Sequence, residues 1–473
     1  MTSDQVGAII EDGPSDWQII QQDDRGVGIV GLRGRWVGDA EDPGTGVVNV
    51  RVVHEATGAP VSAELDWQPA GTRDDHTWAI RLEIPAGGLY RIETRYTAIG
   101  NLTPEWSARG DMRHLVGVGD LWVIAGQSNS AGYGRGAIDD APLLGVHVLR
   151  NSEQWALATH PLNESTDTRH TANREGGNSG HSPYLQVGRR LQGALGHPIG
   201  LIQTALGGSA LAPWNPTEDE PTPLFDTMMH CIDLAGGRIR GIFWYQGESD
   251  AQDPLAETYA ERFQAAVLAW RRALDDPTLP VVTVQLNRVN NPPNGGDDLN
   301  WAIVREAQRR VPHLLDGVVV VPALDLPLSD PIHTSPAGNL VLAERIAQAV
   351  LGSVHGHPVD HLAPDISWAQ RTGERSIVVS FANVVSRIDT IDLTAQPFVV
   401  EDADGSVPVL ETTYPGDDTV VLTLGRTLLG GARVHGAFGA APSPVPLDIE
   451  RSMPMLGFYG FPVADEPASN END

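Results

Sequence analysis

Three side chains in the sequence have the chemical types needed for nucleophilic catalysis by a hydroxyl group. Ser128 follows an apolar run within "VIAGQSNSAG", and Asp330 precedes His333 by three residues within "SDPIHTSPAGN". A hydroxyl is a weak nucleophile until a base removes its proton, and an imidazole can do so near neutral pH. A carboxylate in the same loop can hold the imidazole in the tautomer that leaves its other nitrogen free. The pattern predicts Ser128 as nucleophile, His333 as base and Asp330 as the residue that orients the base.

The same chemistry requires hydrogen-bond donors for the negative charge that develops on a carbonyl oxygen. At Gly207 or Gly208 a bare backbone N–H could approach that oxygen, because no side chain crowds it. The N–H of Ser128 and the side-chain amide of Gln246 would supply the other donors. One such donor is worth roughly 3–4 kcal/mol in the transition state. We therefore expect an oxyanion hole made by Ser128, Gln246 and one of the two glycines.

These residues all follow segments that we expect to be buried strands. Residues 115–352 alternate apolar strand-like runs with amphipathic helical segments, which is the pattern of a parallel α/β sheet. In such sheets, ligands bind beyond the carboxyl ends of the strands. The serine, the glycine pair, the glutamine and the Asp–His pair each come after a different strand. The expected strands cover 121–125, 199–204, 240–245, 281–286 and 317–321, and the expected helices cover 184–195, 257–274 and 337–352.

Each candidate also has an ordinary structural interpretation. A serine among glycines and amides is more often a turn residue than a nucleophile, and paired glycines often form a tight turn. His333 could be a surface loop residue, and Gln246 could belong to a solvated strand end. Their joint placement at successive strand ends favours catalysis over these separate interpretations.

The sequence on both sides of the α/β segment has the pattern of short β-strands. Residues 16–110 contain β-rich runs separated by turn signals such as "DPGTG" and "PAGG", which predicts a small β-sandwich. Residues 356–462 have a similar pattern and predict a second β-domain, with an α/β domain at 111–355 between the two. The segments 1–15 and 463–473 are expected to be tails, and the acidic composition of the second is typical of disorder.

Composition and charge exclude several classes of partner. The 473 residues, 41% hydrophobic and 20% charged, are typical of a folded protein with more than one domain. The 61 acidic against 32 basic residues give a net charge of −29, which would repel a nucleic acid. Cys231 is the only cysteine, so a disulfide within the chain is excluded. The start has no secretory pattern and the apolar runs are too short to cross a bilayer. A cytoplasmic protein without membrane contact is expected, with export left open and no indication of oligomeric state.

Four blocks of the sequence resemble a known superfamily. The stretches "GDLWVIAGQSNSAG", "GLIQTALGGSALAPW", "GIFWYQGESDA" and "SDPIHTSPAGN" resemble, in this order, the blocks of the SGNH (GDSL-like) hydrolases. The closest branch is that of sialate O-acetylesterases and acetylxylan esterases, and the resemblance covers about residues 115–350. It implies a flavodoxin-like, three-layer parallel-sheet core flanked by β-sandwich-like domains. It also implies a serine esterase that removes O-acetyl groups from a carbohydrate through an acetyl-enzyme, with no cofactor.

The resemblance implies roles for the residues of these blocks. Ser128, His333 and Asp330 would form the catalytic triad, and Ser128, Gly207 or Gly208, and Gln246 would form the oxyanion hole. Three further polar residues would support the site through hydrogen bonds, and three aromatic residues could stack on a sugar ring. The supporting residues are Gln127, Asn129 and Glu248, and the aromatic residues are Trp214, Trp244 and Tyr245.

Two other hypotheses compete with a serine esterase. The segment "HGHPVDH" at 355–361 is close to a binuclear metallohydrolase motif, but it contains one additional residue and follows a helix, so we interpret it as a linker and expect no metal. The second alternative is a non-catalytic glycan-binding protein with a degenerate hydrolase core. Release of acetate from an acetylated sugar distinguishes an esterase from a protein that only binds. His170 and His181, in a polar, glycine-rich stretch, are assigned no role.

Overall fold

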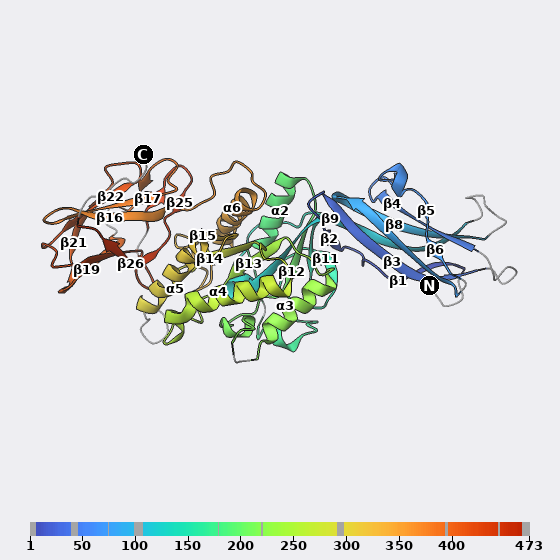
Figure 1. The fold of residues 1–473 in the computed structure, drawn as a ribbon, viewed down its shortest axis with the longest axis horizontal. Coiled ribbons are helices and arrows are strands. Elements are labelled where there is room, and N and C mark those ends of the chain that lie inside the picture. The colour runs from blue at the N-terminus through green and yellow to red at the C-terminus, as the bar shows by residue number, and fades with distance from the viewer. Residues whose placement is uncertain are drawn as a thin grey trace.

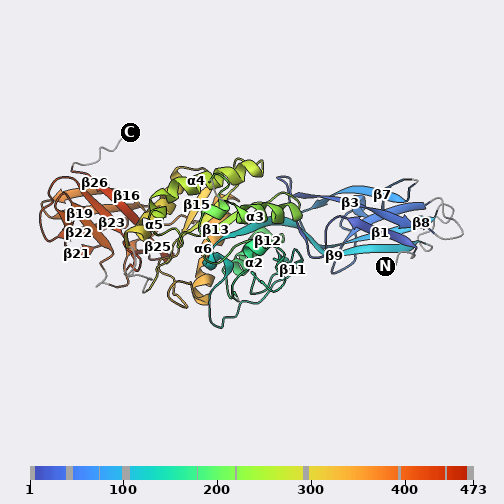
Figure 2. The ribbon, with the colours of Figure 1, turned by 90° about the horizontal axis from the view of Figure 1, so that it is seen from below.

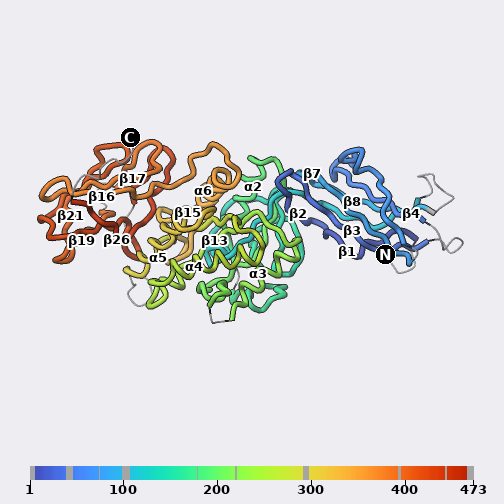
Figure 3. The backbone as a smooth tube through the Cα atoms, in the orientation of Figure 1, coloured from blue at the N-terminus to red at the C-terminus, as the bar shows by residue number. Residues whose placement is uncertain are grey.

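The three predicted parts of the chain lie in a row along the long axis of the molecule. The computed structural model describes residues 6–38, 46–73, 75–98, 107–177, 179–218, 221–290, 298–392, 396–442 and 445–465. Figure 1 shows β-sheets at each end and a helix-covered sheet in the middle. The tube in Figure 3 follows the same order, with the N-terminal part at one end and the C-terminal part at the other. The expected disorder of the acidic end concerns residues that are mostly outside the described ones.

Two sheets form the N-terminal part, and their core is made by alternating apolar side chains. The first strand corrects the expectation of a tail at 1–15, because Ala8 and Ile10 are buried where it pairs with the third strand. One sheet has the order β1 (Gly7–Asp12), β3 (Val27–Val37), β7 (Thr77–Pro85) and β6 (Gly71–Thr72). The other contains β2 (Ile19–Gln21), β4 (Gly46–His54), β5 (Gln68–Pro69), β8 (Gly87–Ala98) and the beginning of β9 (Ala108–Gly126).

Strand β9 belongs to both the N-terminal part and the middle part. Its first half pairs with β8, from Ala108 opposite Tyr96 to Val118 opposite Gly87. Its second half pairs with two strands of the central sheet, and it ends at Gly126. The domain boundary expected at residues 110/111 therefore falls inside a continuous strand. No loop separates the two parts along β9.

The central sheet has the strand order expected of a flavodoxin-like fold. Its path is β11-β10-β12-β9-β13-β14-β15, and only β11 is antiparallel to its neighbour. Apart from the β10–β11 hairpin, the strands in chain order have the arrangement 2-1-3-4-5, so the chain changes direction across the sheet at β9. Ligands bind at such a switch point. The bounds are β10 (Val146–Leu149), β11 (Trp155–Leu157), β12 (Ile199–Gln203), β13 (Gly241–Tyr245), β14 (Val281–Gln285) and β15 (Val318–Pro322).

Helices cover both faces of this sheet and complete the three layers (Figure 2). On one face, α2 (Tyr184–Leu195) packs against α6 (Pro336–Ser353), and on the other α4 (Leu255–Ala273) packs against α5 (Asp298–Arg310) beside α3 (Pro223–Leu234). The side chain of Ser335 accepts a hydrogen bond from the N–H of Gly338 and so caps α6. The short helices are α1 (Ser128–Ala131), η1 (Ala63–Leu65), η3 (Thr171–Asn173), η4 (Ala212–Trp214) and η6 (Val311–His313). Among the described residues, no helix has both the length and the apolar character needed to cross a membrane.

The C-terminal part consists of small antiparallel sheets around a separate apolar core. One sheet has the order β16 (Asp365–Gly373), β17 (Ser376–Ala382), β22 (Thr419–Leu424) and β21 (Val409–Thr413). A second has the order β20 (Gly405–Val407), β19 (Phe398–Asp402), β23 (Ala432–Gly436) and β26 (Phe458–Val463). The third is formed by β18 (Ile388–Asp389), β24 (Leu447–Asp448) and β25 (Met453–Pro454).

Candidate active site

The end of β9 places Ser128 at the carboxyl edge of the central sheet. Gly126 lies opposite Tyr245 of β13, and the N–H of Gln127 donates to the carbonyl of Tyr245 over 2.9 Å. Gly126 has a φ of +114°, and a Cβ there would lie 2.3 Å from that carbonyl oxygen. Only glycine therefore fits at this bend. Ser128 then begins the short helix α1, with 7% of its surface exposed.

Asp330 and His333 form a close pair in the loop between β15 and α6. Oδ2 of Asp330 lies 2.6 Å from Nδ1 of His333. Oδ1 of Asp330 accepts the backbone N–H groups of Ile332 and His333, over 2.9 and 2.8 Å. Partial burial acts to raise the pKa of Asp330, but the contact with His333 and these two N–H groups lower it below its usual value. An ionised carboxylate accepts the Nδ1 proton, so Nε2 of His333 is left to accept another proton.

The side chain of Asn129 connects the serine segment to the histidine loop. Its Nδ2 donates to the carbonyl of Ile332 over 3.3 Å, and its Oδ1 accepts the N–H of Thr334 over 3.0 Å. These two residues are the neighbours of His333 on either side. The residue that follows Ser128 is therefore bonded to the backbone on both sides of the histidine. These bonds favour the supporting role predicted for Asn129, which stays a prediction.

Glu248 holds the amide of Asn129 in the orientation that these bonds require. Nδ2 of Asn129 also donates to Oε1 of Glu248 over 2.8 Å. Burial raises the pKa of Glu248, and its other carboxyl oxygen is buried without a hydrogen bond from any described residue. Gln127 supports the next loop, because its Oε1 accepts the N–H of Ser249 over 3.1 Å. Glu248 and Gln127 thus contact the segments that carry the candidate residues, and their supporting role stays a prediction.

The structure distinguishes between the two candidate glycines. The N–H of Gly207 already donates to Oε1 of Glu175 over 2.9 Å, so it is not free to bind an oxyanion. Gly208 has a φ of +70°, and no heavy atom lies within 4 Å of a Cβ built on it. Of the two predicted alternatives, the geometry therefore favours the N–H of Gly208.

The structure corrects the role predicted for Gln246. This side chain is fully buried. Its Nε2 lies 2.5 Å from Oδ2 of Asp250 and 3.3 Å from the carbonyl oxygen of Ser209, and its Oε1 accepts the hydroxyl of Tyr259 over 3.1 Å. Because its two amide hydrogens have acceptors inside the protein, Gln246 does not present a donor to a substrate. It stabilises the loops that follow β12 and β13 instead.

Tyr133, which lies beside His333, and its partner Glu175 were not found from the sequence. The ring of Tyr133 lies 5.1 Å from the ring of His333, centroid to centroid, and its hydroxyl donates to Oε2 of Glu175 over 2.7 Å. The other oxygen of this carboxylate accepts the N–H of Gly207 and the amide of Asn163, so Glu175 joins three loops. An aromatic residue five positions after the candidate nucleophile was the only available signal. Glu175 lies in an irregular glycine-rich segment, where no periodic pattern indicates which side chains point inward.

Other predicted groups do not meet at the site. Trp214, Trp244 and Tyr245 have no exposed surface, so none of them can stack on a sugar from solvent. In the segment 355–361, His355 lies 3.2 Å from Asp120, whereas Nε2 of His361 lies 2.8 Å from the hydroxyl of Ser353. These imidazoles are directed to different partners. The segment follows α6 as a linker, which agrees with the interpretation from the sequence.

An open cavity of about 540 Å³ adjoins Glu175. It is lined by residues 161 and 163–166 and by Glu175, Gly176, Gly177 and Ser179. Its polar lining suits a hydroxylated ligand better than an apolar one. Glu175 thus lines this cavity and also accepts hydrogen bonds from Tyr133 and Gly207.

Comparison with known proteins identifies the middle part of the chain. Residues 118–352 match the family model described as carbohydrate esterase, sialic acid-specific acetylesterase. The match covers most of the α/β domain, which is therefore similar to the members of this carbohydrate esterase family. The resemblance seen in the four sequence blocks is therefore confirmed, and so is the expected class of enzyme.

Two relatives extend the comparison beyond the family match. The esterase domain is similar to a probable carbohydrate esterase of Arabidopsis thaliana, with 28% identity over 278 residues, which is 54% of this chain and 98% of the relative. The solved structure of a carbohydrate acetylesterase from Xanthomonas citri has a TM-score of 0.64 and 21% identity, covering 94% of this chain and 97% of that one. This second likeness shows that the overall fold, with its two flanking β-parts, is shared. The α/β core with additional β-domains is thus confirmed.

Proposed function

We propose that this carbohydrate esterase removes O-acetyl groups from a sugar by a Ser128–His333–Asp330 mechanism. The observation that carries the proposal is the pair of bonds from Asn129 to the backbone on both sides of His333. These bonds hold the imidazole loop against the segment that begins at Ser128. The close contact of Asp330 with Nδ1 supports a base whose Nε2 is free.

The reaction proceeds through an acetyl-enzyme in two steps. His333 takes the proton from Ser128 as Oγ attacks the acetyl carbonyl, and the N–H groups of Ser128 and Gly208 donate to the oxyanion. When the tetrahedral intermediate collapses, the C–O bond to the sugar breaks and His333 returns the proton to the sugar oxygen. A water molecule then loses its proton to the same imidazole and attacks the acetyl carbonyl. Acetate leaves, and the Ser128 hydroxyl is restored.

Substitution of the nucleophile tests this mechanism. The Ser128→Ala variant is expected to release acetate from acetylated xylan, and to hydrolyse p-nitrophenyl acetate, at least about 10³-fold more slowly than the unsubstituted protein. Its thermal unfolding should be little changed. For the unsubstituted protein, mass spectrometry of an acid-quenched reaction should find an acetyl group on the peptide that contains Ser128.

A second serine of the same short helix provides the matched control. The hydroxyl of Ser130 lies 2.8 Å from the carbonyl oxygen of Ala125 and 2.8 Å from the hydroxyl of Tyr184, and the side chain is fully buried. Ser130→Ala should therefore keep most of the activity. If Ser128→Ala hydrolyses both substrates at the original rate, Ser128 is not the nucleophile. If the unsubstituted protein binds acetylated xylan but releases no acetate over long incubation, the glycan-binding alternative is supported instead.

A further inference from the structure

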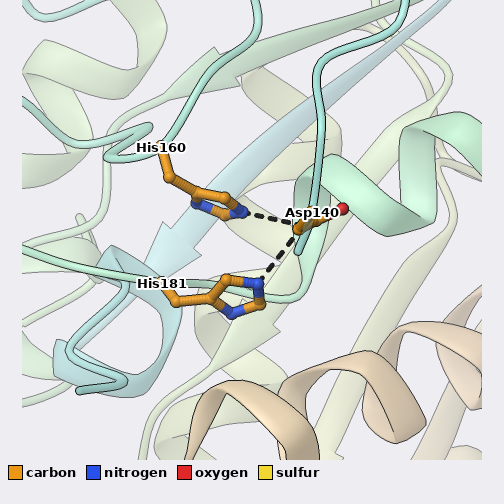
Figure 4. A group of neighbouring side chains, drawn as sticks. All are labelled: Asp140, His160 and His181. Carbon is orange, nitrogen blue, oxygen red and sulfur yellow. Dashed lines mark hydrogen bonds and ion pairs between the residues drawn. The ribbon is translucent and has the colours of Figure 1, made fainter. Parts of the chain in front are cut away.

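Three side chains from separate loops meet in a cluster that the proposed reaction does not use. Asp140, His160 and His181 point toward one another (Figure 4). Oδ2 of Asp140 lies 2.9 Å from Nε2 of His160 and 3.2 Å from Nε2 of His181. The three possible ligand atoms all lie within 4.8 Å of one another. Residues separated by about twenty positions in the chain are thus brought to one point.

The hydrogen bonds within the described residues do not fully account for this cluster. His181 is only 5% exposed, and its Nε2 is buried and makes no hydrogen bond with a described residue, although it faces the carboxylate. Its contact with Oδ2 of Asp140, over 3.2 Å, is not an aligned hydrogen bond. The geometry leaves it directed at the point where Oδ2 of Asp140 and Nε2 of His160 also converge.

The carboxylate is ionised and held in place from its other side. Arg189 contacts Oδ1 of Asp140 over 3.1 Å, which leaves Oδ2 for the two imidazoles. Burial acts to raise the pKa of Asp140, but His160 and His181 lower it well below its usual range. A carboxylate oxygen and two imidazole nitrogens are a donor set that suits zinc and related divalent ions.

We propose that Asp140, His160 and His181 bind a divalent transition-metal ion of the zinc type. Metal–ligand distances of about 2.0–2.2 Å place neighbouring ligand atoms roughly 3–3.5 Å apart, so the two measured distances need only small adjustments. The arginine contact is the type of second interaction that orients a ligating carboxylate. Asn339 holds the residue from behind, because its Nδ2 donates to the carbonyl of His181 over 3.0 Å and lies 3.3 Å from Nδ1 of the ring.

The proposed ion would keep a coordination position open to solvent. A cavity of about 500 Å³ adjoins the three ligands. It is lined by residues 134–138, 140, 142, 159–161, 180 and 181. A water molecule or a small oxygen ligand entering from this cavity can complete a tetrahedral site.

The ion would stabilise the loops beside the proposed triad without taking part in the reaction. The carbonyl of His181 accepts the N–H of Gly134 over 3.1 Å, and the carbonyl of Gly134 accepts the N–H of His181 over 3.0 Å. Gly134 follows Tyr133, whose ring lies against His333. A metal that joins the three loops would therefore hold this rim segment, while the serine chemistry remains as proposed above.

A second cluster supplies an internal control for weak surface binding. Glu153, His170 and His230 also have ligand atoms within 4.8 Å of one another, but their side chains are between 26% and 46% exposed. Solvated groups of this kind give up favourable hydration when they bind an ion. We therefore assign the metal to the buried cluster, and substitution at His230 separates the two.

The test is metal binding measured directly on the full chain. The protein is treated with a chelator, dialysed, and titrated with Zn²⁺ by calorimetry and with Co²⁺ by visible absorption at neutral pH. We expect one tight equivalent of Zn²⁺ and a Co²⁺ spectrum typical of nitrogen and oxygen ligands. His160→Asn should weaken this binding by more than about 100-fold, because loss of a ligand exceeds the roughly 10–100-fold effect of losing a residue behind one.

Two further variants make the result independent of catalysis and of folding. Ser128→Ala and His230→Asn should both bind Zn²⁺ as tightly as the unsubstituted protein. Asp140→Gln is the second ligand variant, and each variant's circular dichroism and thermal unfolding show whether it is folded. The proposal is overturned if the protein takes up no Zn²⁺ at micromolar concentrations. It is equally overturned if folded His160→Asn binds Zn²⁺ unchanged, which would place the ion elsewhere.

Discussion

Asn129 takes no part in the proposed reaction, but its side chain fixes the loop that carries His333. It makes hydrogen bonds to three groups, and two of these are the backbone on either side of the imidazole. Removing the amide leaves the N–H of Thr334 and the carbonyl of Ile332 without these partners. The loop is then free to shift relative to Ser128, although no reacting atom has been removed.

We therefore expect Asn129→Ala to reduce kcat by about 10²-fold, which is the cost of displacing a catalytic group by about 1 Å. KM should change much less, because Asn129 is not proposed to contact the substrate. Asn129→Asp should not restore activity, since a carboxylate cannot donate to Ile332 or to Glu248. Initial rates with p-nitrophenyl acetate give both constants, and an unchanged kcat would contradict the positioning role.

The buried carboxyl of Glu248 makes a pH-dependent contribution to stability. Burial raises its pKa in the folded protein, whereas an unfolded glutamate has a pKa of about 4.3. The protonated form therefore stabilises the fold below pH ~4.3, and this contribution is lost as the pH rises toward the raised folded value. Glu248→Gln, which does not ionise, should gain stability relative to the unsubstituted protein as the pH rises from about 4 to 7.

Urea unfolding of the two proteins at several pH values measures this difference. A difference in stability that stays constant across the range would show that Glu248 is ionised with an ordinary pKa. The same variant tests orientation of Asn129, because a glutamine can still offer an oxygen to Nδ2. Its activity should therefore fall less than that of Asn129→Ala.

At the scale of elements, the bend after β9 depends on a single glycine. A Cβ at Gly126 would lie 2.3 Å from the carbonyl oxygen of Tyr245, at a φ that side chains rarely adopt. Gly126→Ala should destabilise the protein by about 1–3 kcal/mol and reduce activity through displacement of Ser128. Thermal unfolding and p-nitrophenyl acetate hydrolysis measure the two effects.

Gly193 in α2 is the matched control for this substitution. A Cβ there has no heavy atom within 4 Å, and the residue lies inside a regular helix. Gly193→Ala should therefore stabilise the protein by roughly 0.5–1 kcal/mol. If both substitutions have the same effect on stability, the bend at Gly126 is not strained in the way the geometry indicates.

The elements that hold the site could be predicted because their patterns are local. Five short apolar runs became β9, β12, β13, β14 and β15, and each predicted site residue follows one of them. The serine-capped start of α6 has a local signal as well, since Ser335 and Pro336 are the usual residue types at these positions. Period and turn signals specify the backbone, and the backbone brings the strand ends together.

The partner of each donor could not be predicted, because it depends on contacts between distant loops. Packing decides whether Gln246 faces a substrate or Asp250. Packing also decides that the N–H of Gly207 donates to Glu175. The cluster of Asp140, His160 and His181 comes from irregular segments without periodicity. The hairpin β10–β11 was also missed, because its strands are short.

At the scale of the whole molecule, Arg305 joins the esterase domain to the C-terminal part. Its guanidinium is buried and donates to the carbonyls of Leu286 and Asn287 on one side and of Gly439 and Ala440 on the other. Burial lowers its pKa to about 9. Four carbonyl oxygens from two parts of the chain thus share one cation.

Arg305→Ala should lower the free energy of unfolding by roughly 2–4 kcal/mol, because it leaves buried carbonyls without donors. Arg305→Lys should recover little, since an ammonium cannot reach the same set of acceptors. Arg310 on the same helix is exposed, and Arg310→Ala should change stability by no more than about 0.5 kcal/mol. Thermal unfolding and limited proteolysis measure these effects, and equal losses in Arg305→Ala and Arg310→Ala would contradict the joining role.

The continuity of β9 has a mechanical consequence. The strand has 19 residues, at about 3.3 Å each. Its first half is paired in the N-terminal part, and Ser128 lies just past its other end. A hinge between these parts would require broken sheet hydrogen bonds, so the N-terminal part cannot swing over the serine as a flap. A ligand bound on the surface of the N-terminal part would therefore stay at a fixed distance from Ser128. Removal of residues 1–110 would cut β9 and take away the strand pairing at the end of β9 that is far from Ser128.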